Sequence, residues 1–110
     1  MKKDALKVWQ DNNAQQFADV LTDIEDVQSM KNFLRDVMTE KEIIEISSRL
    51  EAAKMLKAGM KYTTIAEETK LSSRTIARIS EWLKNGCKGY DEAFIVVNQH
   101  HAHIPPVSAA

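Results

Sequence analysis

The stretch from Tyr62 to Ile79 constrains the fold more than any other part of the chain. It carries two helix-capping residues, Thr63 and Ser72, only nine positions apart. A capping side chain accepts a hydrogen bond from a free backbone N–H at a helix start. At 3.6 residues per turn, this spacing limits the helices to about two or three turns. Two short helices with a tight corner are the layout of a helix-turn-helix, over about residues 62–84, whose second helix enters a DNA major groove.

Apolar residues recur in this stretch at the spacing that two packed helices require. Ala66 is small enough for a close helix crossing, and the predicted core between the helices is Ile65, Leu71, Ile76 and Ile79. Arg74 and Arg78 are four residues apart and therefore share a face. We expect four side chains to point outward from the second helix: Ser73, Arg74, Ala77 and Arg78. The alternative interpretation is an αα-hairpin inside an ordinary helical bundle.

The corner between the two helices carries Lys70 where a glycine is usual. The chain takes a left-handed conformation at such a corner, which costs a lysine roughly 1 kcal/mol. The lysine also places a positive charge close to where DNA phosphates would lie. We predict that the DNA contacts come from this motif and its flank: Thr63, Thr64, Lys70, Ser72, Ser73, Arg74, Thr75, Ala77, Arg78 and Lys84.

The charge of the chain is distributed unevenly, although the net charge is only −1. Residues 1–53 hold 7 Lys and Arg against 11 Asp and Glu, residues 54–88 hold 8 against 3, and residues 89–110 hold none against 2. The positive segment coincides with the helix-turn-helix. A local basic surface is what binding to backbone phosphates requires, so double-stranded DNA is the expected partner.

Length and composition predict one globular domain. The chain has 110 residues, of which 44% are apolar and 28% charged. No apolar run approaches the length of a membrane span, and the N-terminus does not resemble a signal peptide. The single Cys87 excludes an internal disulfide and fits the cytoplasm. We predict a domain over residues 1–97 and a C-terminal tail over residues 98–110.

The rest of the chain predicts an all-α fold of five to six helices. Thr39 and Glu42 form a capping box, which opens the longest helix over about residues 40–58, and Gly59 ends it. Asp23 is the expected cap of the preceding helix. Residues 3–10 are expected to form a short helix that either continues into the helix over residues 13–22 or is separated from it by a turn at Gln10–Asn13. The other expected helices cover residues 24–37, the second motif helix to about Asn85, and a short last segment over residues 91–97.

An ordered set of segments from about Phe17 to Tyr90 resembles the Trp repressor superfamily, and within it the TrpR-like YerC/YecD family. The segments are Phe33–Thr39, Ile46–Leu50, Ala53–Leu56, Gly59, Tyr62–Ala66, Ser72–Ile79, Leu83–Gly86 and Gly89–Tyr90. The resemblance implies an intertwined homodimer that presents two helix-turn-helices to a near-palindromic operator. It also implies transcriptional control of the repressor type.

The resemblance also implies where an effector would bind. Arg49 and Arg78 match the two arginines that hold tryptophan in the Trp repressor, and Thr39 matches a pocket threonine. Ile79, however, stands where the repressor has glycine, and its side chain would fill the indole slot. We therefore expect no cofactor, and L-tryptophan is not the expected co-repressor. The structural alternatives are an Arg49–Glu45 ion pair and a phosphate contact by Arg78.

Two other classes of function compete with DNA binding. The first is a dimeric protein-interaction module that kept the fold without specific DNA contacts. The second is metal binding by His100, His101 and His103, but no cysteine or carboxylate lies beside these histidines. An enzyme is not expected, because the sequence shows no nucleophile with a base and no phosphate loop.

Overall fold

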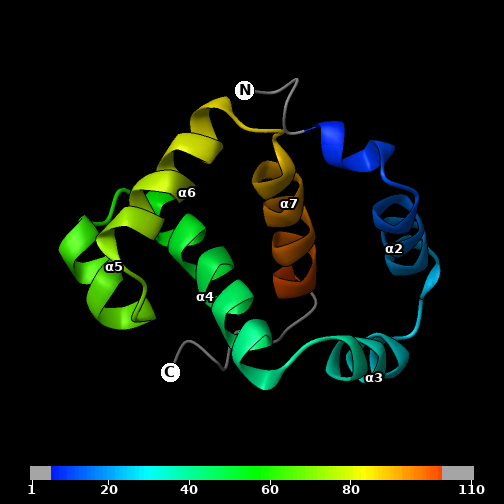
Figure 1. Cartoon of the computed structure of the whole chain (residues 1–110). Helices are drawn as coiled ribbons and strands as arrows, with labels where there is room; N and C mark the ends of the chain where they lie inside the picture. The colour runs from blue at the N-terminus through cyan, green and yellow to red at the C-terminus, as the bar shows by residue number, and fades with distance from the viewer. Residues whose placement is uncertain (1–5, 103–110) are drawn as a thin grey trace.

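The computed structural model describes residues 6–102, and within them the fold is all-helical (Figure 1). The elements are the 3-10 helix η1 (Lys7–Gln10) and six α-helices: α2 (Asn12–Asp23), α3 (Val27–Val37), α4 (Glu40–Lys57), α5 (Tyr62–Thr69), α6 (Ser73–Asn85) and α7 (Gly89–Ala102). The predicted all-α class is confirmed. None of these described helices combines the length and the apolar character needed to cross a membrane.

The capping box at the start of α4 is confirmed. The Glu42 backbone N–H donates to the Thr39 hydroxyl at 3.1 Å, and the Thr39 N–H donates to the Glu42 carboxylate at 2.8 Å. The bond from the Thr39 N–H is the main reason that the pKa of Glu42 lies below its usual value, because it favours the charged carboxylate. At the other end Gly59 takes φ +83°, as predicted for a helix stop.

The boundary between α2 and α3 was predicted wrongly. Asp23 is the last residue of α2 rather than a cap, and α3 begins at Val27 rather than near residue 24. The cap is Asp26, whose carboxylate accepts from the Ser29 N–H at 2.8 Å. Ile24 and Asp26 both have extended backbones, which separates the two helices. Asp11 caps α2 in the same way, at 2.9 Å from the Ala14 nitrogen.

The last helix is longer than the predicted segment of residues 91–97. Helix α7 runs from Gly89 to Ala102, so residues 98–102 belong to a helix rather than to a tail. Asp91 and Glu92 lie in its first turn, where negative charge is favourable, and neither glycine nor proline interrupts the sequence from residue 90 to residue 102. The remainder of the expected tail, residues 103–110, lies outside the described residues.

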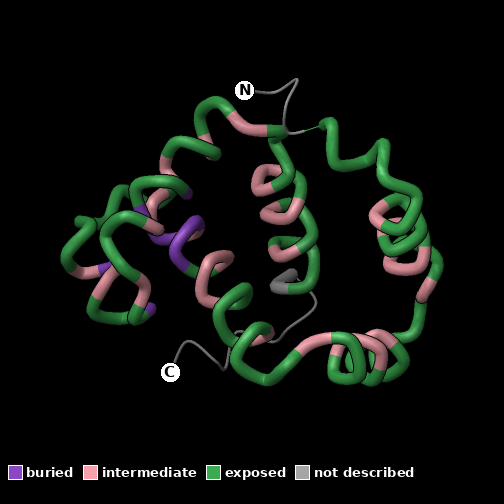
Figure 2. The backbone as a smooth tube through the Cα atoms, in the orientation of Figure 1, coloured by how far each residue is buried: buried purple, intermediate pink, exposed green. Residues whose placement is uncertain are grey.

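The core of the chain lies where α4, α5 and α6 meet, shown in purple in Figure 2. Six apolar side chains are at most 5% exposed there: Ala52, Ala53, Met55, Ile65, Ile76 and Ile79. The partly buried Tyr90 and Phe94 of α7 pack against this cluster, as do Leu56, Ala66, Leu71 and Leu83. The core therefore holds the predicted helix-turn-helix on the C-terminal half of α4.

The N-terminal arm, defined as η1, α2 and α3, contains no buried residue. Figure 1 shows α2 and α3 on the opposite side of the molecule from α5 and α6. The Phe17 and Phe33 rings lie 6.1 Å apart, yet Phe17 remains 39% exposed. Between the arm and the start of α4 is a groove of about 530 Å³, whose apolar lining is Phe17, Leu21, Leu34, Val37, Met38, Ile43 and Ile46.

Candidate nucleic-acid interface

Helix α5 begins two residues earlier than the sequence predicted. Thr63 was expected to cap it, but the cap position is Lys61, and Thr63 is the second residue of the helix. The reason is that Lys61 takes the extended backbone of a cap (φ −71°, ψ 144°), although its side chain forms no cap hydrogen bond. An α-helix leaves its first N–H groups without helical partners. The first turn of α5 therefore presents its amides beside the exposed Thr63 and the half-buried Thr64.

The corner after α5 has the predicted left-handed geometry at Lys70, with φ 64° and ψ 13°. The Lys70 N–H donates to the Ala66 carbonyl at 3.0 Å. The buried Thr69 hydroxyl donates to the Ile65 carbonyl at 2.7 Å and accepts from the Leu71 N–H at 3.3 Å. Sequence reasoning missed this role of Thr69, which ties the corner to α5 without a glycine. Lys70 itself is exposed.

Helix α6 begins as predicted, with Ser72 as its cap. The Ser72 hydroxyl accepts from the Thr75 N–H at 3.1 Å and donates to the Thr75 hydroxyl at 3.0 Å. These bonds occupy both hydroxyl groups at the helix start, and Thr75 is half-buried. Four neighbouring side chains are exposed, as predicted: Ser73, Arg74, Ala77 and Arg78. The first two turns of α6 therefore present two arginines and two small residues to a partner.

The arginines of this face have no acidic partner within the described residues, because the ion pairs found there involve Arg49, Lys54 and Lys57. Glu81 lies seven residues after Arg74 on the same exposed face and accepts from the Asn85 amide at 2.8 Å. Sequence reasoning did not single out this carboxylate, although the spacing would have found it. Lys84 is exposed in the last turn of α6, beyond Glu81.

Two residues of the predicted effector pocket, Thr39 and Arg49, lie well apart within one chain. Thr39 caps the start of α4, while Arg49 lies ten residues further along the same helix, about 15 Å away at 1.5 Å per residue. Ile79 is fully buried in the core, and Arg78 lies on the exposed face of α6. The Ile79 side chain therefore fills the part of the core where the repressor has a glycine.

Arg49 makes the ion pair that was considered as its structural alternative. Its guanidinium lies 3.3 Å from the Glu45 carboxylate, one helical turn away. The Arg49 Nε is buried without a hydrogen-bond partner among the described residues. Burial raises the pKa of the Tyr90 phenol, and the positive charge of Arg49 partly opposes this increase. Arg49 therefore faces the junction of α4 and α7.

The histidine-rich segment provides no metal site within the part of the chain that the structure describes. No group of three or more His, Cys, Asp or Glu side chains lies close enough there to hold a metal ion. His100 is exposed near the end of α7. The His101 side chain and His103 lie outside the described residues, so the hypothesis about these three histidines remains open.

The geometry of α5, the left-handed corner and the capped α6 defines a helix-turn-helix, and comparisons with known proteins agree. Residues 12–98 match the family described as Trp repressor protein. The chain is 36% identical over 70 residues to the uncharacterized protein YerC of Bacillus subtilis strain 168, a stretch covering 64% of this chain and 67% of that protein.

Two solved structures share the fold. One is a TrpR-like protein from Eubacterium eligens, with a TM-score of 0.76, 33% identity and coverage of 84% of this chain and 95% of that one. The other, from Staphylococcus aureus and described as a candidate Trp repressor, has a TM-score of 0.76, 29% identity and coverage of 84% and 93%. The chain belongs to the Trp repressor family. This is a family of DNA-binding regulators and not of enzymes.

Proposed function

We propose that the protein is a sequence-specific transcriptional repressor that binds a near-palindromic DNA operator as a homodimer. The observation that carries this proposal is the exposed face of α6, with Arg74 and Arg78 held outward by a fully buried Ile76 and Ile79. Within the described residues these two arginines form no ion pair. A rigid helix that presents such arginines beside small residues fits a major groove, where arginine recognises guanine through two hydrogen bonds.

The neighbouring groups supply contacts to the DNA backbone in this proposal. The first amides of α5 and the exposed Thr63 hydroxyl would bind one phosphate of the DNA backbone, since helix N-termini favour anions. Lys70 contributes its charge at the corner between the helices. Glu81 would repel phosphates further along α6, so base contacts are confined to the first two turns of the helix.

The homodimer is supported by the N-terminal arm. Its apolar side chains line an open groove of about 530 Å³ with the start of α4, and none of them is buried in the single chain. Ile44 and Ile46, at the start of α4, are also 60% and 54% exposed. Apolar surface of this extent is normally covered by a partner, and a second copy of the chain offers the same surface in return.

The repressor role rests on membership of the family and on the similarity to the Staphylococcus aureus protein described as a candidate Trp repressor. A dimer that occupies an operator blocks access to it, which requires only the DNA contacts and the dimer interface. The cytoplasm, where the chromosome of a bacterium lies, is the compartment in which this function would operate.

Selection of bound sites from a pool of random double-stranded DNA tests the proposal directly. We expect enrichment of a near-palindrome whose half-sites are separated by one helical turn, roughly 34–36 Å, or by a multiple of it. Enrichment should weaken steeply with salt, because phosphate contacts release counterions. A stable dimer that enriches no sequence would refute the proposal and favour the protein-interaction module instead.

A further inference from the structure

The exposed face of α6 carries one carboxylate in line with its arginines. Four exposed residues follow one another at intervals of four, three and four positions: Arg74, Arg78, Glu81 and Asn85. This spacing places them in one stripe along the helix. At 1.5 Å per residue, Glu81 lies about 10 Å along the helix axis from Arg74 and about 4.5 Å from Arg78. The carboxylate therefore follows directly after the two turns that make the base contacts in our proposal.

The Glu81 carboxylate is bonded to an amide and not to a cation. Its Oε1 atom accepts a hydrogen bond from the Asn85 side-chain amide at 2.8 Å. Arg78 and Lys84 are each three residues from Glu81, yet neither forms an ion pair with it among the residues that the structure describes. Asn85 lies one turn further along α6. The hydrogen bond thus directs the carboxylate away from the arginines and leaves their charge intact.

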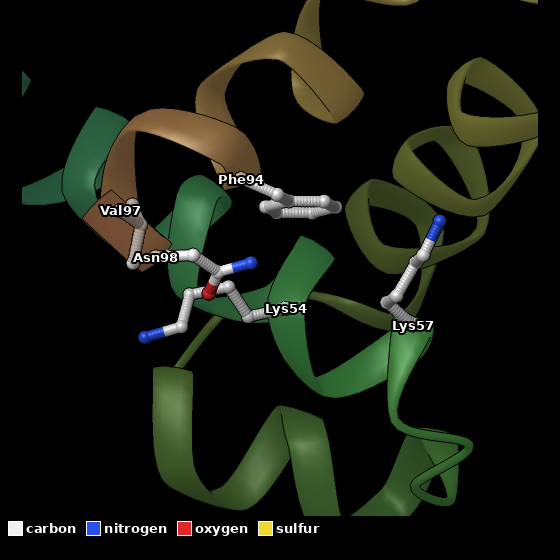
Figure 3. Close-up of a pocket in the computed structure, with 5 residues that line it drawn as sticks. All are labelled: Lys54, Lys57, Phe94, Val97 and Asn98. Carbon is white, nitrogen blue, oxygen red and sulfur yellow. The ribbon is translucent and has the colours of Figure 1, made fainter. Parts of the chain in front are cut away.

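Basic side chains elsewhere in the chain do have carboxylate partners. At a hollow of about 240 Å³ between α4 and α7, Lys54 and Lys57 point to opposite sides of the Phe94 ring (Figure 3). Lys54 lies 3.3 Å from Glu51, on the same helix. Lys57 lies 3.4 Å from Asp91, on α7. The charges of these two lysines are therefore balanced by neighbours, whereas the α6 stripe keeps its carboxylate and its arginines apart.

We propose that Glu81, held in place by Asn85, makes the protein selective for its operator over other DNA, an inference that rests on the proposed function. A carboxylate offers only acceptor atoms, so Glu81 cannot form a hydrogen bond with a phosphate oxygen. Its negative charge also repels phosphates, over a distance of roughly 10 Å at 0.1 M salt. Any pose that brings the third turn of α6 onto the DNA backbone is therefore disfavoured.

This repulsion acts more strongly on random DNA than on an operator. Non-specific affinity comes almost entirely from phosphate contacts, and no base contact fixes the direction of the helix. On random DNA the later turns of α6 can thus approach the backbone, where Glu81 opposes them. On an operator, base contacts through Arg74 keep the first two turns in the groove, so fewer poses bring Glu81 onto a phosphate. Glu81 therefore lowers non-specific affinity more than specific affinity.

Glu81→Gln tests the proposal on the full chain, by fluorescence anisotropy on a selected operator and on a random-sequence duplex of equal length. We expect binding to random DNA to strengthen at least about threefold and binding to the operator less than about twofold, so that the preference for the operator falls. The control Glu25→Gln removes the same charge at an exposed position between α2 and α3, on the opposite side of the molecule from α6 (Figure 1). It should leave both affinities unchanged, because salt screens distant charges.

Asn85→Ala tests the positioning role of the amide. Without Asn85 the carboxylate can turn to Arg78, since ion pairs between residues three positions apart on a helix are favourable. We expect operator affinity to fall at least about twofold in Asn85→Ala, and no such fall when the same change is made in the Glu81→Gln variant. Equal losses in the two backgrounds would show that Asn85 acts independently of Glu81 and would overturn its positioning role.

The same titrations separate this inference from the proposed function. A wild-type protein that prefers its operator, together with a Glu81→Gln variant of unchanged preference, would overturn the inference and leave the proposed function intact. A wild-type protein that binds neither duplex would reject the proposed function and the inference with it. A fall in preference confined to Glu81→Gln, with none in Glu25→Gln, supports both.

Discussion

Between Ala52 and Ile79 the chain buries six apolar side chains, whereas the N-terminal arm from Lys7 to Val37 buries none. Both regions carry apolar residues at helical spacing, and both have well-capped helices. They differ in what is available to cover the apolar faces. The C-terminal half of α4 packs against α5 and α6 of the same chain, whereas the arm packs only against the start of α4.

This difference separates two sources of stability. Burial of apolar surface stabilises a fold by roughly 25 cal/mol per Å², and only the region around the core gains it within one chain. The arm must gain it from another molecule, which in our proposal is a second copy. The two regions should therefore respond differently to substitution and to protein concentration.

The largest expected effect is in the core. Ile76→Ala should destabilise the protein by about 2–5 kcal/mol, because Ile76 is fully buried and its removal leaves a cavity. Urea unfolding measures the loss, and Ile76→Val should cost only about 0.5–1.5 kcal/mol. A cost below about 1 kcal/mol for the alanine variant would show that the core is not packed as described.

The corresponding change in the arm should act mainly on association. Phe17→Ala should weaken the homodimer by about 2 kcal/mol or more, since a buried aromatic anchor at an interface contributes this much. That is roughly thirtyfold or more in the dissociation constant, measured by sedimentation equilibrium. Gln16→Ala, at the exposed preceding position, is the control. A wild-type protein that sediments as a monomer at micromolar concentration would contradict the proposal that a second copy of the chain covers the arm.

Substitutions on the exposed face of the motif should leave both sources of stability intact. Arg74→Ala should flatten the preference among operator variants by roughly 1–3 kcal/mol, the value of a bidentate arginine–guanine contact. Lys70→Ala should instead weaken binding to all DNA alike and reduce the salt slope by about one. Competition binding at several salt concentrations measures both quantities. If Arg74→Ala selects the same motif as the wild type, our placement of α6 in the groove is wrong.

L-Tryptophan tests whether the two regions share a ligand site, because Thr39 adjoins the arm and Ile79 lies in the core. We expect no strong binding, since the indole would have to displace a packed side chain at a cost of roughly 1–3 kcal/mol, up to about two hundredfold in affinity. Calorimetry at about 100 µM protein decides the question. Saturable binding of one tryptophan per subunit near 10 µM would contradict the prediction.

The smallest expected effect comes from the two left-handed lysines, Lys70 (φ 64°) and Lys88 (φ 67°). Replacement by glycine should relieve the backbone at either position and stabilise the chain by about 1 kcal/mol or less. Only Lys70→Gly should also weaken DNA binding, so Lys88→Gly is its matched control. Thermal unfolding and DNA titration together measure the pair, and equal losses of DNA affinity would show that Lys88 also contacts DNA.

The local signals in the sequence determined much of this protein. The capping residues Thr39 and Ser72, the stop at Gly59 and the outward position of Arg74 and Arg78 were all predicted from the sequence and are present in the structure. These features depend on contacts within a few residues. The cap of α3 was predicted wrongly at Asp23, and the structure places it at Asp26, after a short extended segment.

Tertiary structure decided which apolar faces are covered and which groups share a site. Apolar residues at helical spacing mark both the arm and α6, and Ile79 was correctly predicted in the core, but only packing shows that Phe17 remains 39% exposed. The buried Thr69 hydroxyl supports the corner, and the hollow beside Phe94 joins residues about forty positions apart in the chain. The physical reason is that burial depends on the position of distant segments, which the periodicity of a single helix does not contain.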